Sequence, residues 1–463
     1  MTAPLKNIRR ALVVGTGVSA RAAITQLVRF GVHVDVVDEH ITADAATHVT
    51  ALGADVIDGP VIEAFLSGAL EYNLVIPSPG VPETHPVFRA AHAVDVPVWS
   101  EPELASRLFP RRTIGITGTN GKTTTTELVA EMLNASGITA HACGNIGPAV
   151  CDVAASSDVD DVLVMELSSF QLRFASTLTP SIGVVLNLAV DHLDWHPSFG
   201  AYAAAKAQMF TGQSPKDFAV ANADDPATHE LANQGGTCVM FSGVNPVATG
   251  VGVENGTLVA RFGETQFPVL ATADIARGDA ANHVVANVAA AATASLLAGA
   301  TVEAVAAVAR AFTPGAHRLQ LVATDRNQVR YINDSKATNA HAAIAALRAV
   351  GRCVWLAGGV SKNASLSALH DALSDVDAAV VFGQAAKDLA QVCTEAGVVV
   401  HQVETLQDAV TRAATLAQPD TAVLLAPACA SFDQFADYRD RGEAFTRYAT
   451  AACMESKEND GAA

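Results

Sequence analysis

The hydrophobic positions of the chain fall into short apolar runs separated by longer stretches rich in alanine and charged residues. The first run, ALVVGTG, is followed by a helix-like stretch from Ala22 to Phe30 and then by a second run, VHVDVVD. Strand-like runs that alternate with helix-like stretches indicate parallel sheets covered by helices. The alternation continues along the chain, with runs such as DVLVMEL, SIGVVLNL, RCVWLAGG, AAVVFG, GVVVHQV and TAVLLAP. The pattern therefore predicts an α/β fold.

The length of 463 residues is too great for one ordinary hydrophobic core and predicts about three domains. We expect a Rossmann-like domain over residues 1–110, a central P-loop ATPase-like domain over 111–313, and a C-terminal Rossmann-like α/β domain over 314–463. The turn signal Thr313-Pro314-Gly315 marks the last boundary.

Composition and charge exclude several classes of protein. No stretch of about 18 apolar residues is free of charge, so a membrane span is not expected. The formal net charge of −18 argues against nonspecific binding of nucleic acid, which needs clustered lysine and arginine. The seven cysteines show no CxxC spacing, so neither a zinc site nor a disulfide framework is indicated, and a reducing cytoplasm is the expected location. Basic residues before ALVVGTGVSA resemble a signal peptide, but the two glycines fit a strand, turn and helix better.

The segment TGTNGKTTTT follows the apolar run TIGI and has the form of a loop that binds phosphate groups. Gly118 and Gly121 let backbone N–H groups approach phosphate oxygens, Lys122 supplies a positive charge, and Thr123 offers a hydroxyl to Mg²⁺. The strict pattern has a further glycine where Ile116 stands, so this is a shortened variant. The helix-forming run ELVAEML after it favours a nucleoside triphosphate site over an ordinary glycine turn.

A second nucleotide motif lies near the amino terminus. The segment from Gly15 to Ala20 matches G-x-G-x-x-A, and Asp38 ends the next predicted strand. A second glycine turn, Ser78-Pro79-Gly80, follows the run NLVIP. The motif fits a dinucleotide enzyme, but any nucleotide diphosphate can bind the same helix N-terminus.

Polar residues follow the predicted strands of the central region, where open parallel sheets bind their ligands. Glu166 ends the strand DVLVMEL and is either a ligand of a hard cation or a solvated strand end. The segment NLAVDHLDWH suggests metal or phosphate binding, although a histidine such as His192 is often a structural hydrogen-bonding group. Lys206 lies among small apolar residues and either reaches solvent or is buried. Burial favours a neutral amine, which can react with CO₂ to give a carbamate that helps to bind Mg²⁺.

The motifs TGTNGKT, GNIG, MELSSFQL, the DH of NLAVDHLD, AHR, NDSKATN and PACASFDQF, in that order, resemble the Mur ligase family of peptidoglycan synthesis. The resemblance covers all three predicted domains. The motifs NDSKATN and PACASFDQF resemble those of the family branch that adds D-glutamate to UDP-N-acetylmuramoyl-L-alanine. This implies an ATP-dependent ligase in which a carboxylate attacks the γ-phosphate and the incoming amine displaces phosphate from the acyl phosphate.

The resemblance also implies a role for individual residues. The catalytic residues would be Lys122, Lys206, His192 and Glu166, and two Mg²⁺ ions would be held by Thr123, Glu166, His192 and carbamylated Lys206. ATP would contact Gly118, Thr119, Asn120, Gly121, Lys122, Thr123, Thr124, Asn287, Arg318 and Asp334. The UDP-sugar would contact Val18, Ser19, Asp38, Glu39, Ser78, Pro79, Gly80, Asn145 and Gln171. D-Glutamate would contact Lys336, Thr338, Lys362, Ser431 and Tyr438.

The chain departs from common family patterns at four places. His283 is followed by Val284 where H-N-x-x-N is common, GGVSKNASL replaces a GGxxKGxDF pattern, and Tyr438 stands where phenylalanine is common. After Asp38, Glu39 and His40 differ from the usual hydroxyl and arginine. These departures concern the adenine, amino-acid and uracil contacts.

Four alternatives remain open from the sequence alone. They are a sister ligase that adds another amino acid, a folylpolyglutamate synthase-like ligase, a dehydrogenase and a noncatalytic ATP-binding regulator. A dehydrogenase leaves TGTNGKT unexplained, and a regulator has no need of Glu166, His192 and Lys206 together. We expect a cytoplasmic monomer that acts on small molecules and binds neither nucleic acid nor a membrane.

Overall fold

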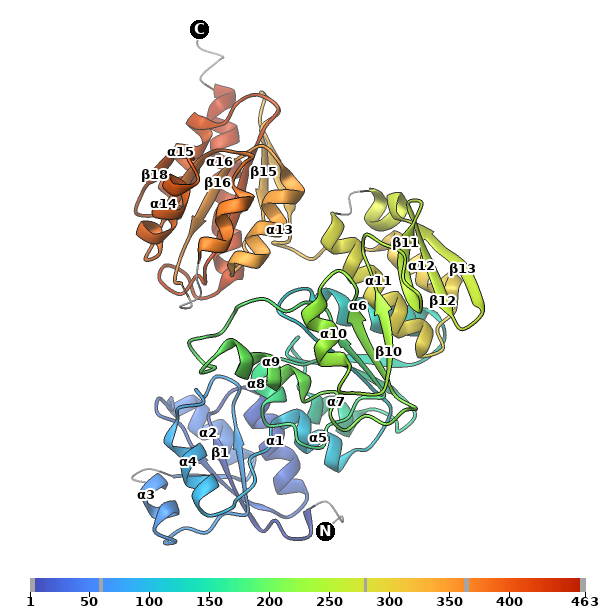
Figure 1. Ribbon diagram of the computed structural model, residues 1–463. Helices are drawn as coiled ribbons and strands as arrows, with labels where there is room; N and C mark the ends of the chain where they lie inside the picture. The colour runs from blue at the N-terminus through green and yellow to red at the C-terminus, as the bar shows by residue number, and fades with distance from the viewer. Residues whose placement is uncertain (1–4, 58–60, 279–280, 362–365, 459–463) are drawn as a thin grey trace. The chain divides into compact units, whose positions relative to one another are not determined.

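The computed structural model describes residues 5–57, 61–278, 281–361 and 366–458 (Figure 1). Strands alternate with helices along the chain, and the strands form three sheets. This arrangement confirms the predicted α/β class. The chain divides into two compact units. The first contains the described residues of Met1–Leu188 and Trp195–Phe312, and the second those of Ala189–Asp194 and Thr313–Ala463.

The first sheet is parallel and has the strand order β3-β2-β1-β4. Both faces are covered by apolar side chains, because alternate residues of each strand enter different cores: Ala11 and Val13 pack on one face, and Leu12 and Val14 on the other. The strands are β1 (Arg10–Val14), β2 (His33–Val37), β3 (Asp55–Val56) and β4 (Leu74–Pro77), and the helices are α1 (Val18–Arg29), α2 (Ala43–Ala51), α3 (Val61–Leu66) and α4 (Pro86–Ala93).

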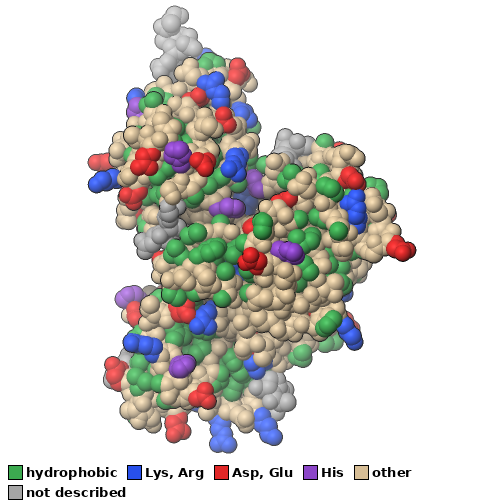
Figure 2. Space-filling view, in the orientation of Figure 1, with side chains coloured by type: hydrophobic (Ala, Val, Ile, Leu, Met, Phe, Trp, Pro, Cys, Tyr) green, Lys and Arg blue, Asp and Glu red, His purple; other side chains and the backbone are tan. Residues whose placement is uncertain are grey.

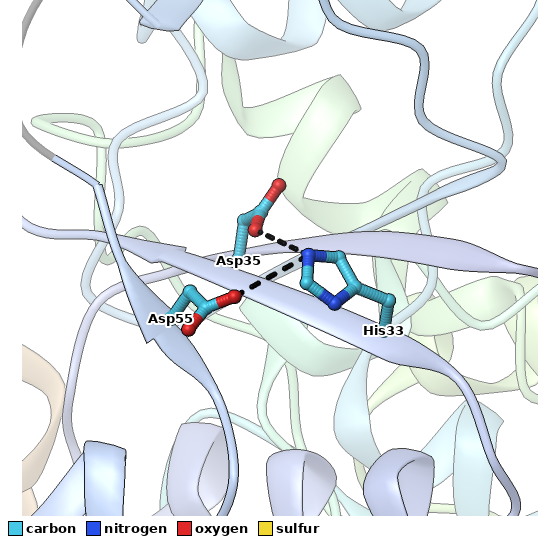
Figure 3. A group of neighbouring side chains, drawn as sticks. All are labelled: His33, Asp35 and Asp55. Atoms are coloured by element: carbon cyan, nitrogen blue, oxygen red, sulfur yellow. Dashed lines mark ion pairs between the residues drawn. The ribbon is translucent and has the colours of Figure 1, made fainter.

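Ion pairs join the amino ends of three of these strands. Figure 3 shows the two pairs that His33 makes with Asp35 and Asp55. Asp35 is buried, and its Oδ2 accepts a hydrogen bond from Arg10 Nε at 2.7 Å. His33 Nε2 lies 3.1 Å from Asp35 Oδ1 and 3.5 Å from Asp55 Oδ2. These contacts compensate for the buried charge of Asp35. These ion pairs lie at the amino ends of the strands, whereas the Gly15 turn follows the carboxyl end of β1.

The second sheet has nine strands in the order β13-β12-β11-β10-β9-β8-β5-β7-β6. Strands β5 to β11 pair in parallel, whereas β12 and β13 add an antiparallel extension at one edge. The strands are β5 (Thr113–Thr117), β6 (Ala140–Gly144), β7 (Val162–Glu166), β8 (Ile182–Val185), β9 (Phe218–Asn222), β10 (Thr237–Phe241), β11 (Gly250–Glu254), β12 (Thr257–Phe262) and β13 (Thr265–Ala271). The helices are α5 (Glu101–Leu108), α6 (Lys122–Ala135), α7 (Val150–Ser156), α8 (Ser169–Leu172), α9 (Phe199–Ala207), α10 (Pro226–Ala232), α11 (Asn282–Leu297) and α12 (Val302–Ala311), with a 3-10 helix η2 (Thr272–Gly278).

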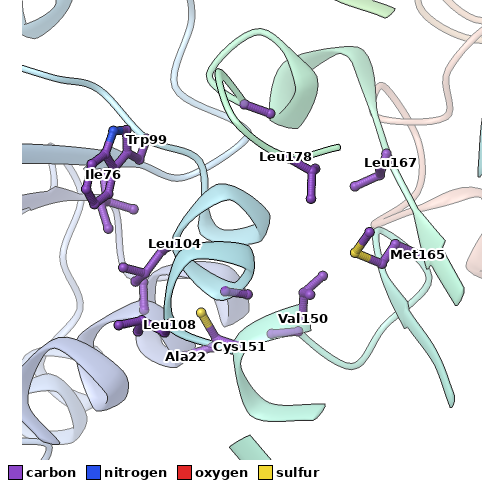
Figure 4. Packing of buried hydrophobic residues seen from close by; sticks show 14 of the residues in the cluster. Ala22, Ile76, Trp99, Leu104, Leu108, Val150, Cys151, Met165, Leu167 and Leu178 are labelled. Carbon is purple, nitrogen blue, oxygen red and sulfur yellow. The ribbon is translucent and has the colours of Figure 1, made fainter. Parts of the chain in front are cut away.

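The first two sheets share one hydrophobic core within the first unit (Figure 4). Leu104 of α5 and Val150 of α7 belong to this core, together with Ile76 of β4 and Met165 of β7. Helices α5 and α7 therefore connect the amino-terminal sheet to the nine-stranded sheet by apolar packing.

The third sheet belongs to the second unit and has the order β14-β15-β19-β16-β17-β18. All its pairs are parallel except β14 with β15. Trp355 and Leu424 pack on one face, and Leu356 and Leu425 pack on the other. The strands are β14 (Gln320–Thr324), β15 (Arg330–Asn333), β16 (Cys353–Gly358), β17 (Val376–Phe382), β18 (Val400–Gln402) and β19 (Ala422–Ala428), and the helices are α13 (Ala340–Val350), η3 (Leu366–Ala372), α14 (Ala386–Glu395), α15 (Leu406–Leu416) and α16 (Tyr438–Glu458).

The surface carries charged side chains of both signs (Figure 2), and the described cysteines form no disulfides. Acidic and basic side chains are interspersed on the face shown in Figure 2. All seven cysteines are free thiols. Among the described residues, no helix has the length and apolar character needed to cross a membrane.

Candidate functional site

The phosphate loop joins β5, which ends at Thr117, to α6, which begins at Lys122. Gly118 has φ of 149° and Gly121 has φ of 84°, in the region that side chains rarely adopt. A Cβ atom on Gly121 would collide with the side chain of Asn287. The loop therefore requires glycine at Gly121 and brings Asn287, predicted as an ATP contact, next to it.

Side chains from other elements hold this loop in place. Asn187, which follows β8, accepts a hydrogen bond from Asn120 N at 2.8 Å and donates one to Asn120 O at 3.1 Å. Thr119 Oγ1 lies 2.9 Å from the hydroxyl of Tyr202. The Lys122 amine donates to the carbonyls of Gly118 and Thr119 at 2.9 and 2.8 Å. The amine thus lies against the loop.

Thr123 and Thr124 occupy the first turn of α6. Thr123 is half-buried, whereas Thr124 is buried. Both lie at the helix N-terminus, where backbone N–H groups and the helix dipole favour anions.

Lys206 of α9 is buried beside the same loop, with 1% of its surface exposed. Its amine donates to Gly118 O at 2.9 Å and to Thr117 Oγ1 at 3.3 Å, and it lies 4.6 Å from the ring centre of Tyr202. This burial contradicts the alternative in which the Lys206 amine reaches solvent. It also provides the buried environment that favours a neutral amine, which carbamate formation requires.

Glu166 ends β7, the strand next to β5, and is 2% exposed. Its Oε1 accepts a hydrogen bond from Asn145 Nδ2 at 2.7 Å. Its Oε2 is buried and accepts no hydrogen bond from the described residues. A solvated strand end is therefore the wrong interpretation. A buried carboxylate oxygen without a donor fits a ligand of a hard cation.

Gln171 and its neighbours have a local role that sequence reasoning missed. Gln171 Oε1 accepts hydrogen bonds from the backbone N–H and the hydroxyl of Ser168, which forms a capping box at the start of α8. The S-x-x-Q spacing was the available signal. His196 Nε2 lies 2.9 Å from Ser169 Oγ, so this buried histidine also has a hydrogen-bonding partner close to α8.

The structure groups His192 with the second unit rather than with Glu166 and Lys206. Its φ is 56°, and its Nε2 lies 3.7 Å from Asp191 Oδ2. Asp191 is buried and accepts a hydrogen bond from Asn339 Nδ2 at 2.9 Å. The short segment Ala189–Asp194 is thereby bonded to the N-cap residue of α13.

The predicted UDP-sugar residues of the first sheet gather at the carboxyl ends of β1, β2 and β4. Thr16 Oγ1 donates to Asp38 Oδ2 at 2.8 Å. Gly15 has φ of 99°, and a Cβ atom there would lie 2.8 Å from Ser78 Cβ. Glu39 pairs with His85 at 3.6 Å. Of the remaining predicted contacts, Val18 and Ser19 begin α1, and Pro79 and Gly80 follow β4. Val18 and Gly80 are exposed, and Ser19 and Pro79 are half-buried.

In the second unit, the loop after β15 carries several predicted contacts. The Lys336 amine lies 3.9 Å from the ring centre of Tyr438, and Thr338 N donates to Lys336 O at 2.8 Å. Asp334 Oδ1 accepts the Leu319 N–H at 3.2 Å. Burial raises the pKa of Asp334 to about 7, and nearby Arg318 opposes that rise.

The two remaining predicted amino-acid contacts are Ser431 and Lys362. Ser431 is buried after β19. Lys362 lies outside the described residues. Arg441 of α16, which is fully buried, had no signal in the sequence because its partners come from three distant segments.

Two protein-family models match the chain. Residues 116–295 match the Mur ligase middle domain, and residues 317–429 match the Mur ligase glutamate ligase domain. A UDP-N-acetylmuramoylalanine–D-glutamate ligase of Frankia casuarinae is 40% identical over 459 residues, covering 96% of this chain and 94% of that protein. A protein of the same name from Shouchella clausii is 38% identical over 444 residues, covering 95% and 96%.

A solved structure also resembles the chain over its full length. The MurF ligase of Thermotoga maritima, in complex with ADP, has a TM-score of 0.57 at 15% identity and covers 100% of each chain. This likeness shows a shared fold. Since the two family domains cover most of the chain and the curated relatives match it nearly end to end, the chain belongs to the Mur ligase family.

Proposed function

We propose that the protein joins D-glutamate to UDP-N-acetylmuramoyl-L-alanine with consumption of ATP, in the synthesis of peptidoglycan precursors. Two relatives that match nearly the whole chain carry the name of this ligase. The structural observation that carries the proposal is the buried group beside the phosphate loop. Lys206 contacts the loop directly, and Glu166 keeps a buried carboxylate oxygen without a hydrogen-bond donor.

The chemistry begins at the phosphate loop. Backbone N–H groups at the N-terminus of α6 would bind the phosphates of ATP, and the Lys122 amine would exchange its two carbonyl partners for phosphate oxygens. A carboxylate oxygen of the sugar substrate then attacks the γ-phosphorus as ADP leaves. The D-glutamate amine attacks the resulting acyl carbon, loses a proton and displaces inorganic phosphate. Asn287, Arg318 and Asp334 are proposed as the remaining ATP contacts.

Two Mg²⁺ ions would be held by Thr123, Glu166, His192 and Lys206, the last as a carbamate. When bound, the ions would neutralise the negative charges that meet between carboxylate and phosphate. The orphaned oxygen of Glu166 fits such a ligand. Asn145 holds the other oxygen and so fixes the orientation of the carboxylate.

Substrate contacts complete the proposal. The UDP-sugar would bind at Val18, Ser19, Asp38, Glu39, Ser78, Pro79, Gly80, Asn145 and Gln171. D-Glutamate would bind at Lys336, Thr338, Lys362, Ser431 and Tyr438. The domain limits 1–110, 111–313 and 314–463 would then assign one substrate to each domain. We further propose that the protein is a cytoplasmic monomer acting on small molecules, without a nucleic-acid or membrane partner.

The test is phosphate release from ATP and Mg²⁺ in the presence of UDP-N-acetylmuramoyl-L-alanine. D-Glutamate, L-glutamate, L-alanine and a diamino acid are offered in parallel. The proposal expects turnover with D-glutamate alone. Turnover with another amino acid would assign the chain to a sister ligase, and a folate substrate in place of the UDP-sugar tests the remaining ligase alternative.

A further inference from the structure

Arg441 is a fully buried arginine in the second unit. It lies near the start of α16. Its hydrogen-bond acceptors among the described residues are carbonyls and a hydroxyl rather than carboxylates, and Asp433 adds only a longer-range attraction. Burial lowers the pKa of Arg441 to about 10, which leaves the guanidinium charged at neutral pH. A buried cation without a paired anion is costly unless its N–H donors are satisfied.

The guanidinium donates to three separate segments. Its Nε donates to Ser335 Oγ at 3.0 Å, and its Nη2 donates to Ser335 O at 2.9 Å. Its Nη1 donates to Cys429 O at 3.0 Å and to Gly358 O at 3.3 Å. Backbone carbonyls and one hydroxyl therefore take the place of a carboxylate partner.

Ser335 and Cys429 follow β15 and β19, and Gly358 is the last residue of β16. The three strands are neighbours in the sheet. The carboxyl ends of neighbouring parallel strands are where open α/β sheets bind ligands. The loop after β15 carries Lys336 and Thr338, and the segment after β19 carries Ser431. The guanidinium thus connects the bases of the loops that bear proposed amino-acid contacts.

The packing around the guanidinium leaves little freedom to these loops. Gly359 has φ of 124°, and a Cβ atom there would collide with Ala430 O and lie 3.2 Å from Arg441 Nη1. Val360 and Ala430 exchange backbone hydrogen bonds of 2.8 and 3.0 Å directly beside it. Removal of the guanidinium would leave buried carbonyls without donors and let the loops separate.

We propose that Arg441 is a positioning residue for the amino-acid substrate, because its planar fork sets the spacing between the loops that carry Lys336 and Ser431. This inference deepens the proposed function and rests on it for the identity of the amino acid. Arg441 does not touch the substrate. Its effect is to keep the cations and hydroxyls of the site at the separation that a dicarboxylate needs.

The test compares Arg441→Lys with Arg447→Lys in steady-state kinetics. Lysine keeps the charge but loses the fork, so it cannot satisfy the three segments together. Arg447 is exposed on the same helix and serves as the matched control. We expect Arg441→Lys to raise KM for D-glutamate by about tenfold or more, while KM for the UDP-sugar changes by less than about twofold. The control should leave both constants unchanged.

A second readout is hydrogen exchange without ligands. Amides of residues 335–338 and 429–431 should exchange faster in Arg441→Lys than in Arg447→Lys. A folded Arg441→Lys protein with an unchanged KM for D-glutamate would overturn the inference, as would an equal rise in KM for both substrates.

Ser335→Ala provides a milder variant if Arg441→Lys does not fold. It removes only the hydroxyl acceptor of Arg441 Nε and the bond from Ser335 Oγ to Tyr438 O, at 2.8 Å. KM for D-glutamate should rise by about threefold, and no rise would contradict the inference. Absence of wild-type turnover with D-glutamate would instead contradict the proposed function.

Discussion

The buried carboxyl of Glu101 predicts an unusual dependence of stability on pH. Glu101 begins α5 and is 2% exposed. Its Oε1 accepts the backbone N–H of Cys151 in α7, whereas Oε2 is buried and accepts no hydrogen bond from the described residues. Burial raises the pKa of Glu101 to about 7 from an ordinary 4.5. The folded protein therefore holds this proton over a range in which the unfolded chain has lost it.

The sign and size follow from that difference. Between pH 4.5 and 7 the folded state binds more protons, so the free energy of unfolding falls as pH rises and then levels above pH 7. A shift of about 2.5 units at about 1.36 kcal/mol each gives a cost of about 3 kcal/mol at pH 8. Glu101→Gln keeps a carbonyl acceptor for Cys151 and carries no charge. We expect it to be more stable than the wild type at pH 8 and close to it at pH 5.

The assay is urea unfolding at pH 5 and pH 8, followed by tryptophan fluorescence. Trp355→Phe in both proteins leaves Trp99 and Trp195, which report on the first unit. The stability gap between Glu101→Gln and its parent should grow by about 2 to 3 kcal/mol from pH 5 to pH 8. An equal gap at both pH values would refute the reasoning, because Glu101 would then keep the same charge throughout.

Glu103, on the same helix, provides the control. This buried carboxylate accepts hydrogen bonds from Arg107 Nε at 2.7 Å, Leu178 N at 2.8 Å and Thr177 N at 3.0 Å. Glu103→Gln would turn an NH₂ group toward these donors. It should destabilise the protein at both pH values by about 2 kcal/mol or more. At pH 8, replacement by glutamine is thus expected to stabilise the protein at Glu101 and to destabilise it at Glu103.

Three further predictions concern the site. Gly121→Ala should raise KM for ATP by about tenfold or more, because left-handed backbone strain and the collision with Asn287 distort the loop; an unchanged KM would contradict the described geometry. Lys206→Ala should lose about 99% of the activity and recover part of it with bicarbonate or acetate, whereas no recovery and no added mass on Lys206 would refute the carbamate. Glu166→Gln should raise the Mg²⁺ concentration for half-maximal rate by about tenfold or more, and an unchanged Mg²⁺ titration would remove Glu166 from the metal site.

Local sequence signals predicted the phosphate loop well. A strand, a glycine loop and a helix follow one another within TIGITGTNGKTTTT, so local signals were enough to predict these elements. They gave no sign of the contacts that Asn187 and Tyr202 make with the loop. Local signals also predicted the Gly15 turn and the position of Asp38 at the end of the next strand. The structure pairs these two strands in parallel and joins their carboxyl ends by the bond from Thr16 to Asp38.

Features that depend on distant segments were not predictable. The fully buried Arg441 lies in a polar stretch, and its role depends on how three loops converge. The sequence pattern gave no sign that Asp191, beside His192, accepts a hydrogen bond from Asn339, because the two residues lie far apart in the chain. The capping role of Gln171 was readable from S-x-x-Q, yet the polar cluster suggested ligand binding instead.

The most direct test of the central claim is transfer of ¹⁸O from the carboxylate of UDP-N-acetylmuramoyl-L-alanine to inorganic phosphate. The labelled substrate is incubated with ATP, Mg²⁺ and D-glutamate, and product and phosphate are analysed by mass spectrometry. The account predicts one ¹⁸O atom in each phosphate released, matched by one molecule of the D-glutamyl product. Phosphate without the label, or ATP hydrolysis without the D-glutamyl product, would contradict it.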